Sequence, residues 1–293
     1  MLRADAETAV QWRHFCHEIL TATPEDRIVL LRDRAQRTRR EVLEVICHAG
    51  LGHIGGDFSV ADLLTVLYNG VLHVDPERPD APDRDRFVLS KGHCAVSFYV
   101  TLASCGFFPP AQLAHFAQPG SCLSGHPNRR YTPGVETNTG PLGHGLPVAV
   151  GMAIGLEHRG SSARVFVITG DGELQEGSNW EAFMCASQHR LSNLTIIVDR
   201  NMLQQGARTE ETTGLEPLHE KLSSFGCEVS EVDGHSYEDL YELLNARPTD
   251  DKPRAVIAHT VKGRGVSFME DRVEWHHKVP TAEEAERAIE ELV

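Results

Sequence analysis

Paired cysteines are missing from this 293-residue chain. Its seven cysteines are odd in number, widely spaced and form no Cys-x-x-Cys motif. Disulfide frameworks and zinc sites are usually built from an even or closely paired set of cysteines. The sequence therefore favours neither kind of site, and we expect reduced thiols in a cytoplasmic protein.

The chain also has fewer basic than acidic residues. The chain has 28 Lys and Arg against 42 Asp and Glu, which gives a formal net charge of −14 at pH 7. Sequence-independent binding to nucleic acid depends on clustered Lys and Arg that neutralise phosphates, so we expect no nucleic-acid partner. One local run of arginines is mixed with acids, and we interpret it as the solvated face of a helix: Arg32, Arg34, Arg37, Arg39 and Arg40.

The chain lacks the long hydrophobic segments of exported or membrane proteins. Asp5 and Glu7 lie near its start, and no apolar block follows a basic beginning, so we expect no secretory signal. The stretch 137–156 is free of Asp, Glu, Lys and Arg, but it holds five glycines and two prolines. That composition favours a loop and a buried helix over a lipid-facing span. We expect no membrane association.

Apolar, β-branched runs alternate with helical stretches along most of the chain. Alternation of this kind predicts an α/β fold with a doubly wound, mostly parallel sheet and helices on both faces. We expect a helical extension at 1–35 and one domain at 36–293. Strands are expected at 86–90, 164–169, 194–199, 227–232 and 254–259, and helices at 58–71, 94–105, 144–159, 178–190, 216–225, 236–246 and 282–292.

The segment Gly170-Asp171-Gly172 follows one of these apolar strands directly. Glycine lets backbone N–H groups approach phosphate oxygens, while Asp171 offers the hard oxygen ligand that Mg²⁺ or Ca²⁺ takes. A second apolar strand delivers Asn201 to the same edge of the sheet, with 28 residues between it and Gly172. Ligands of open α/β sheets bind at this edge. The spacing therefore predicts half of a site for a metal-bound diphosphate and is typical of thiamine diphosphate enzymes.

Further segments narrow the resemblance. The order of motifs over residues 36–278 is similar to that of transketolases, and most similar to the N-terminal subunit of two-chain transketolases. That subunit carries a segment like 273–276 close to its C-terminus. The other matching segments are 49–56, 83–93, 124–127, 133–143 and 260–265.

The resemblance implies a role for each motif residue. It implies that His53 and His276 contact donor hydroxyls near the cleaved bond, that His126 contacts the donor's terminal hydroxyl, and that these three are the catalytic residues. Glu176 corresponds to a glutamate at the interface between subunits, although a helix-start carboxylate is an alternative interpretation. The metal ligands are expected to be Asp171, Asn201 and the Leu203 carbonyl, and the cofactor-binding residues His93, Gly140, Leu142, Gly143, Gly170, Gly172, Glu173 and Asn201.

The implied activity is transfer of a two-carbon ketol unit from a ketose or ketose phosphate to an aldose, with thiamine diphosphate and Mg²⁺ or Ca²⁺. The resemblance covers only the diphosphate-binding half, so a C-terminal transketolase subunit is expected as partner in an α₂β₂ assembly. Two alternatives remain open. One is another thiamine diphosphate enzyme, of the 2-oxoacid dehydrogenase or deoxyxylulose phosphate synthase kind. The other is a non-catalytic cofactor-binding or scaffold subunit.

Overall fold

The fold is a three-layer α/β arrangement, seen in a computed structural model that describes residues 2–292. A five-stranded, wholly parallel sheet has the order β1-β2-β3-β5-β4. All five strands lie where the sequence predicts them, and the expected fold class is confirmed. The strands are β1 (Arg86–Leu89), β2 (Val165–Gly170), β3 (Leu194–Arg200), β4 (Glu228–Asp233) and β5 (Arg254–His259).

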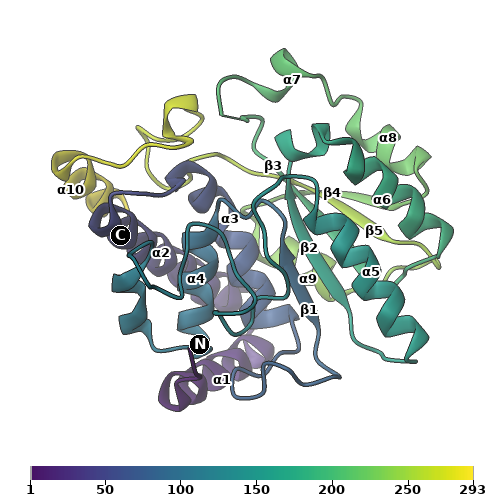
Figure 1. Ribbon diagram of the computed structural model, residues 1–293, viewed down its shortest axis with the longest axis horizontal. Helices are drawn as coiled ribbons and strands as arrows, with labels where there is room; N and C mark the ends of the chain where they lie inside the picture. The colour runs from purple at the N-terminus through teal and green to yellow at the C-terminus, as the bar shows by residue number, and fades with distance from the viewer. Residues whose placement is uncertain (1, 293) are drawn as a thin grey trace.

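Helices cover both faces of this sheet (Figure 1). The chain begins with α1 (Ala6–Thr21), α2 (Pro24–Ala49) and α3 (Ile54–Val66), which a π-helical turn extends to Val71. The rest, listed in chain order, are α4 (Ala95–Ser104), a 3₁₀ turn at Pro110–His115, α5 (Gly145–His158), a 3₁₀ turn at Gly172–Gln175, α6 (Gly177–Gln188), α7 (Thr209–Thr212), α8 (Leu218–Ser224), α9 (Tyr237–Asn245), a 3₁₀ turn at Val273–Trp275 and α10 (Ala282–Glu291).

Alternation along the strands separates two apolar cores. On β2, Phe166 and Ile168 face the core beneath α2, α3 and α4, whereas Val165 and Val167 face the core beneath α5 and α6. Successive side chains of a strand point to opposite sides, so a β-branched strand buried on both faces is the expected pattern of a parallel sheet. The two layers hold the carboxyl ends of the strands rigidly at one edge.

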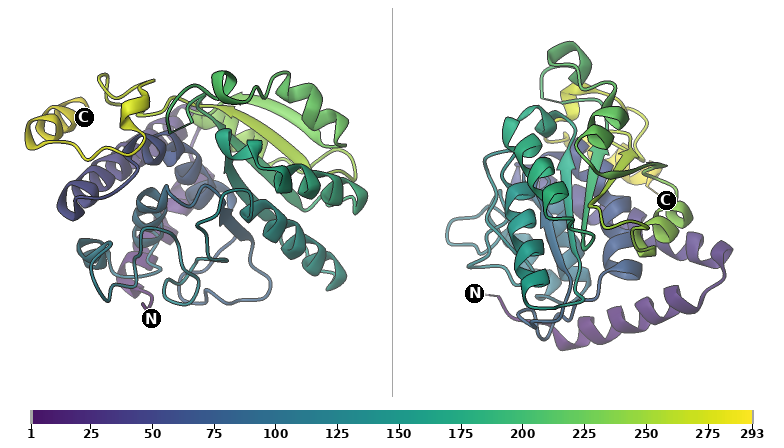
Figure 2. Two further views of the ribbon diagram at one scale, coloured as in Figure 1. Left: turned by 45° about the horizontal axis from the view of Figure 1, so that its top comes forward. Right: turned by 90° about the vertical axis from the view of Figure 1, so that its right-hand side faces the viewer.

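The N-terminal helices pack against the rest of the domain (Figure 2). Leu31, Ala35 and Val42 of α2 are fully buried, and α10 at the far end of the sequence packs on the same helix. Helix α2 runs without a break through residue 35. The division of the chain into 1–35 and 36–293 therefore stays a prediction.

One prediction about α2 is wrong. Arg39 does not lie on a solvated face: it is 3% exposed and its guanidinium binds Asp62 of α3, with Nη2 2.6 Å from Oδ2. Arg32 and Arg37 are exposed as expected. The pattern of charges along one helix could not reveal a partner on another helix. Within residues 2–292, no helix is both long and apolar enough to cross a membrane.

Candidate active site

A cavity of about 430 Å³ opens at the carboxyl edge of the sheet. Parallel strands end there, and the residues that follow β1, β2, β3 and β5 reach it together. Of the residues expected at the site, all but Gly143 line this cavity: His53, His93, His126, Gly140, Leu142, Gly170, Asp171, Gly172, Glu173, Glu176, Asn201, Leu203 and His276. The sequence analysis missed other residues that line it: Gly56, Lys91, Gln175, Gln204, Gln205 and Lys262.

Asp171 lies at the end of β2 with its carboxylate held on both sides. Its Oδ1 accepts the Gly172 N–H at 2.8 Å, and its Oδ2 accepts the Met202 N–H at 2.6 Å. Oδ2 is also 3.2 Å from Nη1 of the buried Arg200. Burial and the neighbouring Asp199 raise the pKa of Asp171. These bonds fix the direction of the carboxylate relative to the turn after β3.

The turn after β3 carries Asn201 and Leu203. The amide Oδ1 of Asn201 accepts the Leu203 N–H at 3.2 Å, which curls the chain so that both residues face the cavity. The Leu203 carbonyl accepts from Lys262 Nζ at 2.7 Å. Oxygen atoms of a carboxylate, an amide and a carbonyl therefore lie on two adjacent turns.

Glycine is required at the centre of this wall. A Cβ on Gly172 would lie 2.7 Å from Gln204 Cβ, and a Cβ on Gly143 would lie 2.6 Å from Glu176 Cβ. Gly143 also has a positive φ of 76°, where a side chain is unfavourable. Close approach of these loops explains why glycine occupies both positions.

Glu173 is buried beneath the loops and organises them. Its Oε1 accepts the Gly143 N–H at 2.9 Å and the Ser90 hydroxyl, and its Oε2 accepts the Gly170 N–H at 3.0 Å. Burial raises the pKa of this carboxyl. The two oxygens together thus accept from three separate segments, those of Ser90, Gly143 and Gly170. Gly143 contributes to the site through its bond to Glu173.

Two buried lysines complete the site. Lys91 contacts Asp199, which also accepts from the Ser59 hydroxyl at 2.7 Å. Burial lowers the pKa of Lys91, but Asp199 together with Cys94 raises it, and the net shift is upward. Within residues 2–292, Lys262 forms no ion pair with a carboxylate, and burial followed by Lys91 lowers its pKa to about 8. Both belong to segments that the sequence analysis singled out, 83–93 and 260–265, so the motifs held the signal.

Three histidines cluster in the same cavity. The ring centroid of His53 lies 5.1 Å from that of His93 and 5.5 Å from that of His276. A fourth ring, His277, lies 4.5 Å from His53. Burial, with further cations nearby, lowers the pKa of His53 to about 4 and that of His276 to about 3. These imidazoles are therefore neutral at pH 7 and can both donate and accept hydrogen bonds.

The cavity offers polar atoms to a ligand. Among the residues described, His126 Nδ1 and Gln204 Oε1 are buried without a hydrogen-bond partner, and both residues line the cavity. Buried polar groups usually have partners, so such atoms indicate a missing polar ligand. No group of three His, Cys, Asp or Glu within residues 2–292 could hold a metal. A cation here would need oxygen donors from the bound ligand, and a diphosphate supplies them.

Comparison with known proteins identifies the domain. Residues 32–292 match the family described as "Transketolase, thiamine diphosphate binding domain". The chain belongs to the transketolase family. An apulose-4-phosphate transketolase subunit of Actinobacillus succinogenes is 46% identical over 263 residues, which are 89% of this chain and 95% of that protein. The 6-deoxy-6-sulfo-D-fructose transketolase subunit of Clostridium sp. is 38% identical over 89% of this chain and 96% of that protein.

The solved transketolases are longer than this chain. The Campylobacter jejuni transketolase superposes with a TM-score of 0.84 and 30% identity, over 89% of this chain but 42% of that protein. Human transketolase is 36% identical over 92% of this chain and 43% of its own length. The transketolase chain described here therefore spans less than half of those proteins, and nearly all of the two relatives that are named as transketolase subunits.

Proposed function

We propose that this chain is the thiamine diphosphate-binding subunit of a two-chain transketolase. It transfers a two-carbon ketol unit from a ketose or ketose phosphate donor to an aldose acceptor. The observation that carries the proposal is a single cavity that joins the oxygen ligands Asp171, Asn201 and Leu203 to the histidines His53 and His276. The relatives that are named as transketolase subunits support the two-chain form.

Thiamine diphosphate and a divalent cation fit this wall. Asp171 Oδ1, Asn201 Oδ1 and the Leu203 carbonyl are the oxygen donors for Mg²⁺ or Ca²⁺, which bind through oxygen. Gly170 and Gly172 leave room for a diphosphate, while His93, Gly140 and Leu142 line the part of the cavity assigned to the rings. When bound, thiamine diphosphate supplies the electron sink for cleavage of the carbon–carbon bond.

The neutral histidines orient the sugar and move its protons. His53 and His276 both line the cavity, where the imidazole of His53 can accept a hydroxyl proton on one nitrogen while donating from the other, and His276, with Nδ1 accepting from Lys262, can donate from Nε2 to a sugar hydroxyl. Lys262 Nζ lies 2.8 Å from His276 Nδ1, which directs the Nε2 of that ring away from the lysine. His126 offers its unpartnered Nδ1 to the far end of the donor.

A partner chain completes the cavity. Leu142 is 36% and Val148 is 39% exposed, and both belong to the uncharged stretch 137–156. Glu176 is exposed and lines the cavity together with Leu142. We assign these residues to the contact with a C-terminal transketolase subunit in an α₂β₂ assembly. An obligate contact of this kind buries about 2,000 Å² or more.

A cytoplasmic location agrees with seven unpaired cysteines.

The choice of donor tests the proposed activity. The purified complex of both chains, with Mg²⁺ and thiamine diphosphate, is given ketose phosphates with aldose acceptors, or pyruvate instead, and the products are identified by mass spectrometry. We expect products two carbons longer than the aldose from the ketose donors. Turnover of pyruvate without ketol transfer would refute the proposal in favour of another thiamine diphosphate enzyme.

A further inference from the structure

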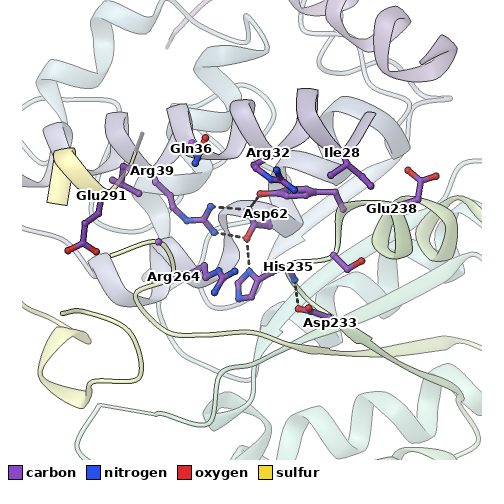
Figure 3. A pocket seen from close by; sticks show the side chains of 14 residues that line it. Ile28, Arg32, Gln36, Arg39, Asp62, Asp233, His235, Glu238, Arg264 and Glu291 are labelled. Atoms are coloured by element: carbon purple, nitrogen blue, oxygen red, sulfur yellow. Dashed lines mark hydrogen bonds and ion pairs between the residues drawn. The ribbon is translucent and has the colours of Figure 1, made fainter. Parts of the chain in front are cut away.

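A buried chain of polar contacts leads from α2 to the active site. It begins at a second cavity, of about 510 Å³, between α2, α9 and the C-terminal end of the domain. Figure 3 shows Arg39, Asp62 and His235 pointing toward one another across this cavity. Asp62 Oδ1 accepts from Tyr237 at 2.7 Å, and Oδ2 accepts from His235 Nδ1 at 2.6 Å.

The charge of Asp62 fixes the tautomer of His235. Burial raises the pKa of Asp62, but Arg39 and the hydrogen bond from His235 lower it further, so the carboxyl is ionised. An ionised carboxylate only accepts hydrogen bonds, so His235 Nδ1 carries the proton. The other ring nitrogen, Nε2, is then free to accept, and it accepts the Val261 backbone N–H at 2.9 Å.

The turn that carries His235 is pressed against the end of β5. Gly234 donates its N–H to the His259 carbonyl at 2.8 Å, and a Cβ on Gly234 would lie 2.4 Å from Thr260 Cγ2. This close approach leaves the two segments little freedom to move apart. The imidazole of His235 therefore reaches the Val261 amide from a fixed base.

Val261 immediately precedes the active-site lysine. Lys262 extends from this turn into the cavity, where its Nζ contacts the Leu203 carbonyl at 2.7 Å and His276 Nδ1 at 2.8 Å. The contacts of Lys262 with Leu203 and with His276 thus depend on where the backbone at 261–262 is held. His235 itself does not line the active-site cavity.

We propose that His235, oriented by Asp62, is a positioning residue that anchors the backbone at Val261 and so places Lys262 against His276. The inference rests on the proposed function, because it takes His276 as a residue of ketol transfer. It assigns a catalytic contribution to a side chain that touches neither cofactor nor substrate. Arg39 contributes by keeping Asp62 ionised.

Two substitutions test separately the hydrogen bond of His235 to Asp62 and its hydrogen bond to Val261. In His235→Asn the amide nitrogen takes the place of Nδ1 and keeps the bond to Asp62, but no atom replaces Nε2. In His235→Gln the amide oxygen takes the place of Nε2 and can accept from Val261. Tyr237→Phe is the matched control, because it removes a bond to Asp62 without altering the contact with Val261. Asp62 keeps its ion pair with Arg39 in every variant.

Hydrogen exchange of backbone amides in the full chain measures the anchor directly. We expect the Val261 amide to exchange about 10-fold faster or more in His235→Asn, and near the unaltered rate in His235→Gln and Tyr237→Phe. The Gly263 amide, which bonds to the Gly55 carbonyl at 2.9 Å, should keep its protection in all three. If His235→Asn lost protection at both the Val261 and the Gly263 amides, or at neither, the proposal that His235 anchors Val261 would be overturned.

Kinetics of the two-chain complex measure the consequence. We expect kcat to fall about 10-fold to 10²-fold in His235→Asn, as for small misplacements of reacting groups, and to recover to within about 3-fold in His235→Gln. Unaltered turnover in His235→Asn, or equal losses in the Asn and Gln variants, would contradict the positioning role. Absence of ketol transfer by the unaltered complex would refute the proposed function instead, and the exchange data would still test the anchor.

Discussion

Replacing Arg200 with methionine should cost this domain a large part of its stability. Arg200 ends the strand β3 and its side chain is 1% exposed. Its Nη1 lies 3.2 Å from Asp171 Oδ2, and its Nη2 lies 2.7 Å from Glu210 and 2.8 Å from Glu216. Methionine conserves most of the volume but removes the charge, so three carboxylates lose their partner.

The three carboxylates differ in burial, which sets the size of the effect. The Asp171 side chain is 2% exposed, whereas Glu210 and Glu216 are 30% and 57% exposed and can be hydrated. Removing one member of a buried ion pair costs about 3–5 kcal/mol, because the other charge stays buried. Exposed pairs contribute about 0–1 kcal/mol each. We therefore expect the free energy of unfolding to fall by about 3–5 kcal/mol.

The loss should depend on pH in a defined direction. Burial already raises the pKa of Asp171, and Arg200 is among the groups that lower it. Without Arg200 the folded-state pKa moves further above the unfolded value. Stability from such a group is present at low pH and lost as pH rises through the folded pKa. The destabilisation should therefore be larger at pH 8 than at pH 5.

Urea unfolding followed by circular dichroism measures these values on the full chain. Arg208→Met is the matched control, because Arg208 pairs with Asp271 at 2.7 Å with both side chains about half exposed. We expect that control to cost about 0–1 kcal/mol. If Arg200→Met cost no more than Arg208→Met, the ion pair would not stabilise the fold and the reasoning would be refuted.

Three further predictions concern individual side chains of the domain. Asp171→Ala should abolish Mg²⁺-dependent binding of thiamine diphosphate by the complex, and unchanged affinity by calorimetry would remove the basis of the metal assignment. Alanine at His53, His126 or His276 should lower turnover by about 10²- to 10⁴-fold while leaving cofactor affinity nearly intact, and steady-state kinetics with normal rates would exclude these roles. Burial raises the pKa of Asp57 from 3.8 to about 7, so its stabilising contribution is complete below pH 4 and lost by pH 7. Asp57→Asn should therefore gain thermal stability relative to the unaltered chain between pH 5 and pH 8, by at most roughly 4 kcal/mol, and a difference that does not change with pH would contradict this.

The sheet could be predicted from the sequence because its strands are buried on both faces. Runs such as that of β2, Val165–Gly170, are mostly apolar and β-branched, and the residues directly after them lie at one edge in any parallel sheet. Asp171 and Asn201 could therefore be brought together before their side chains were seen. The helix α2, Pro24–Ala49, was harder, because residues 24–35 pack into the core without a motif that marks them.

The missed features depend on contacts between segments distant in the sequence. Arg39 pairs with Asp62, and His235 reaches the backbone of Val261, through contacts that no local pattern reveals. Glu173 lines the cavity as expected of a site residue, and its carboxylate also accepts hydrogen bonds from Ser90, Gly143 and Gly170. Its sequence neighbours gave no sign of that arrangement.

The central claim is that this chain supplies half of a ketol-transfer site, and reconstitution tests it most directly. The purified chain is assayed for ketol transfer with saturating Mg²⁺ and thiamine diphosphate, first alone and then with the C-terminal transketolase subunit. Asp171→Ala in the reconstituted complex serves as the inactive reference. We predict no ketol transfer from the isolated chain and full activity on addition of the partner. Robust ketol transfer by the isolated chain would contradict the account.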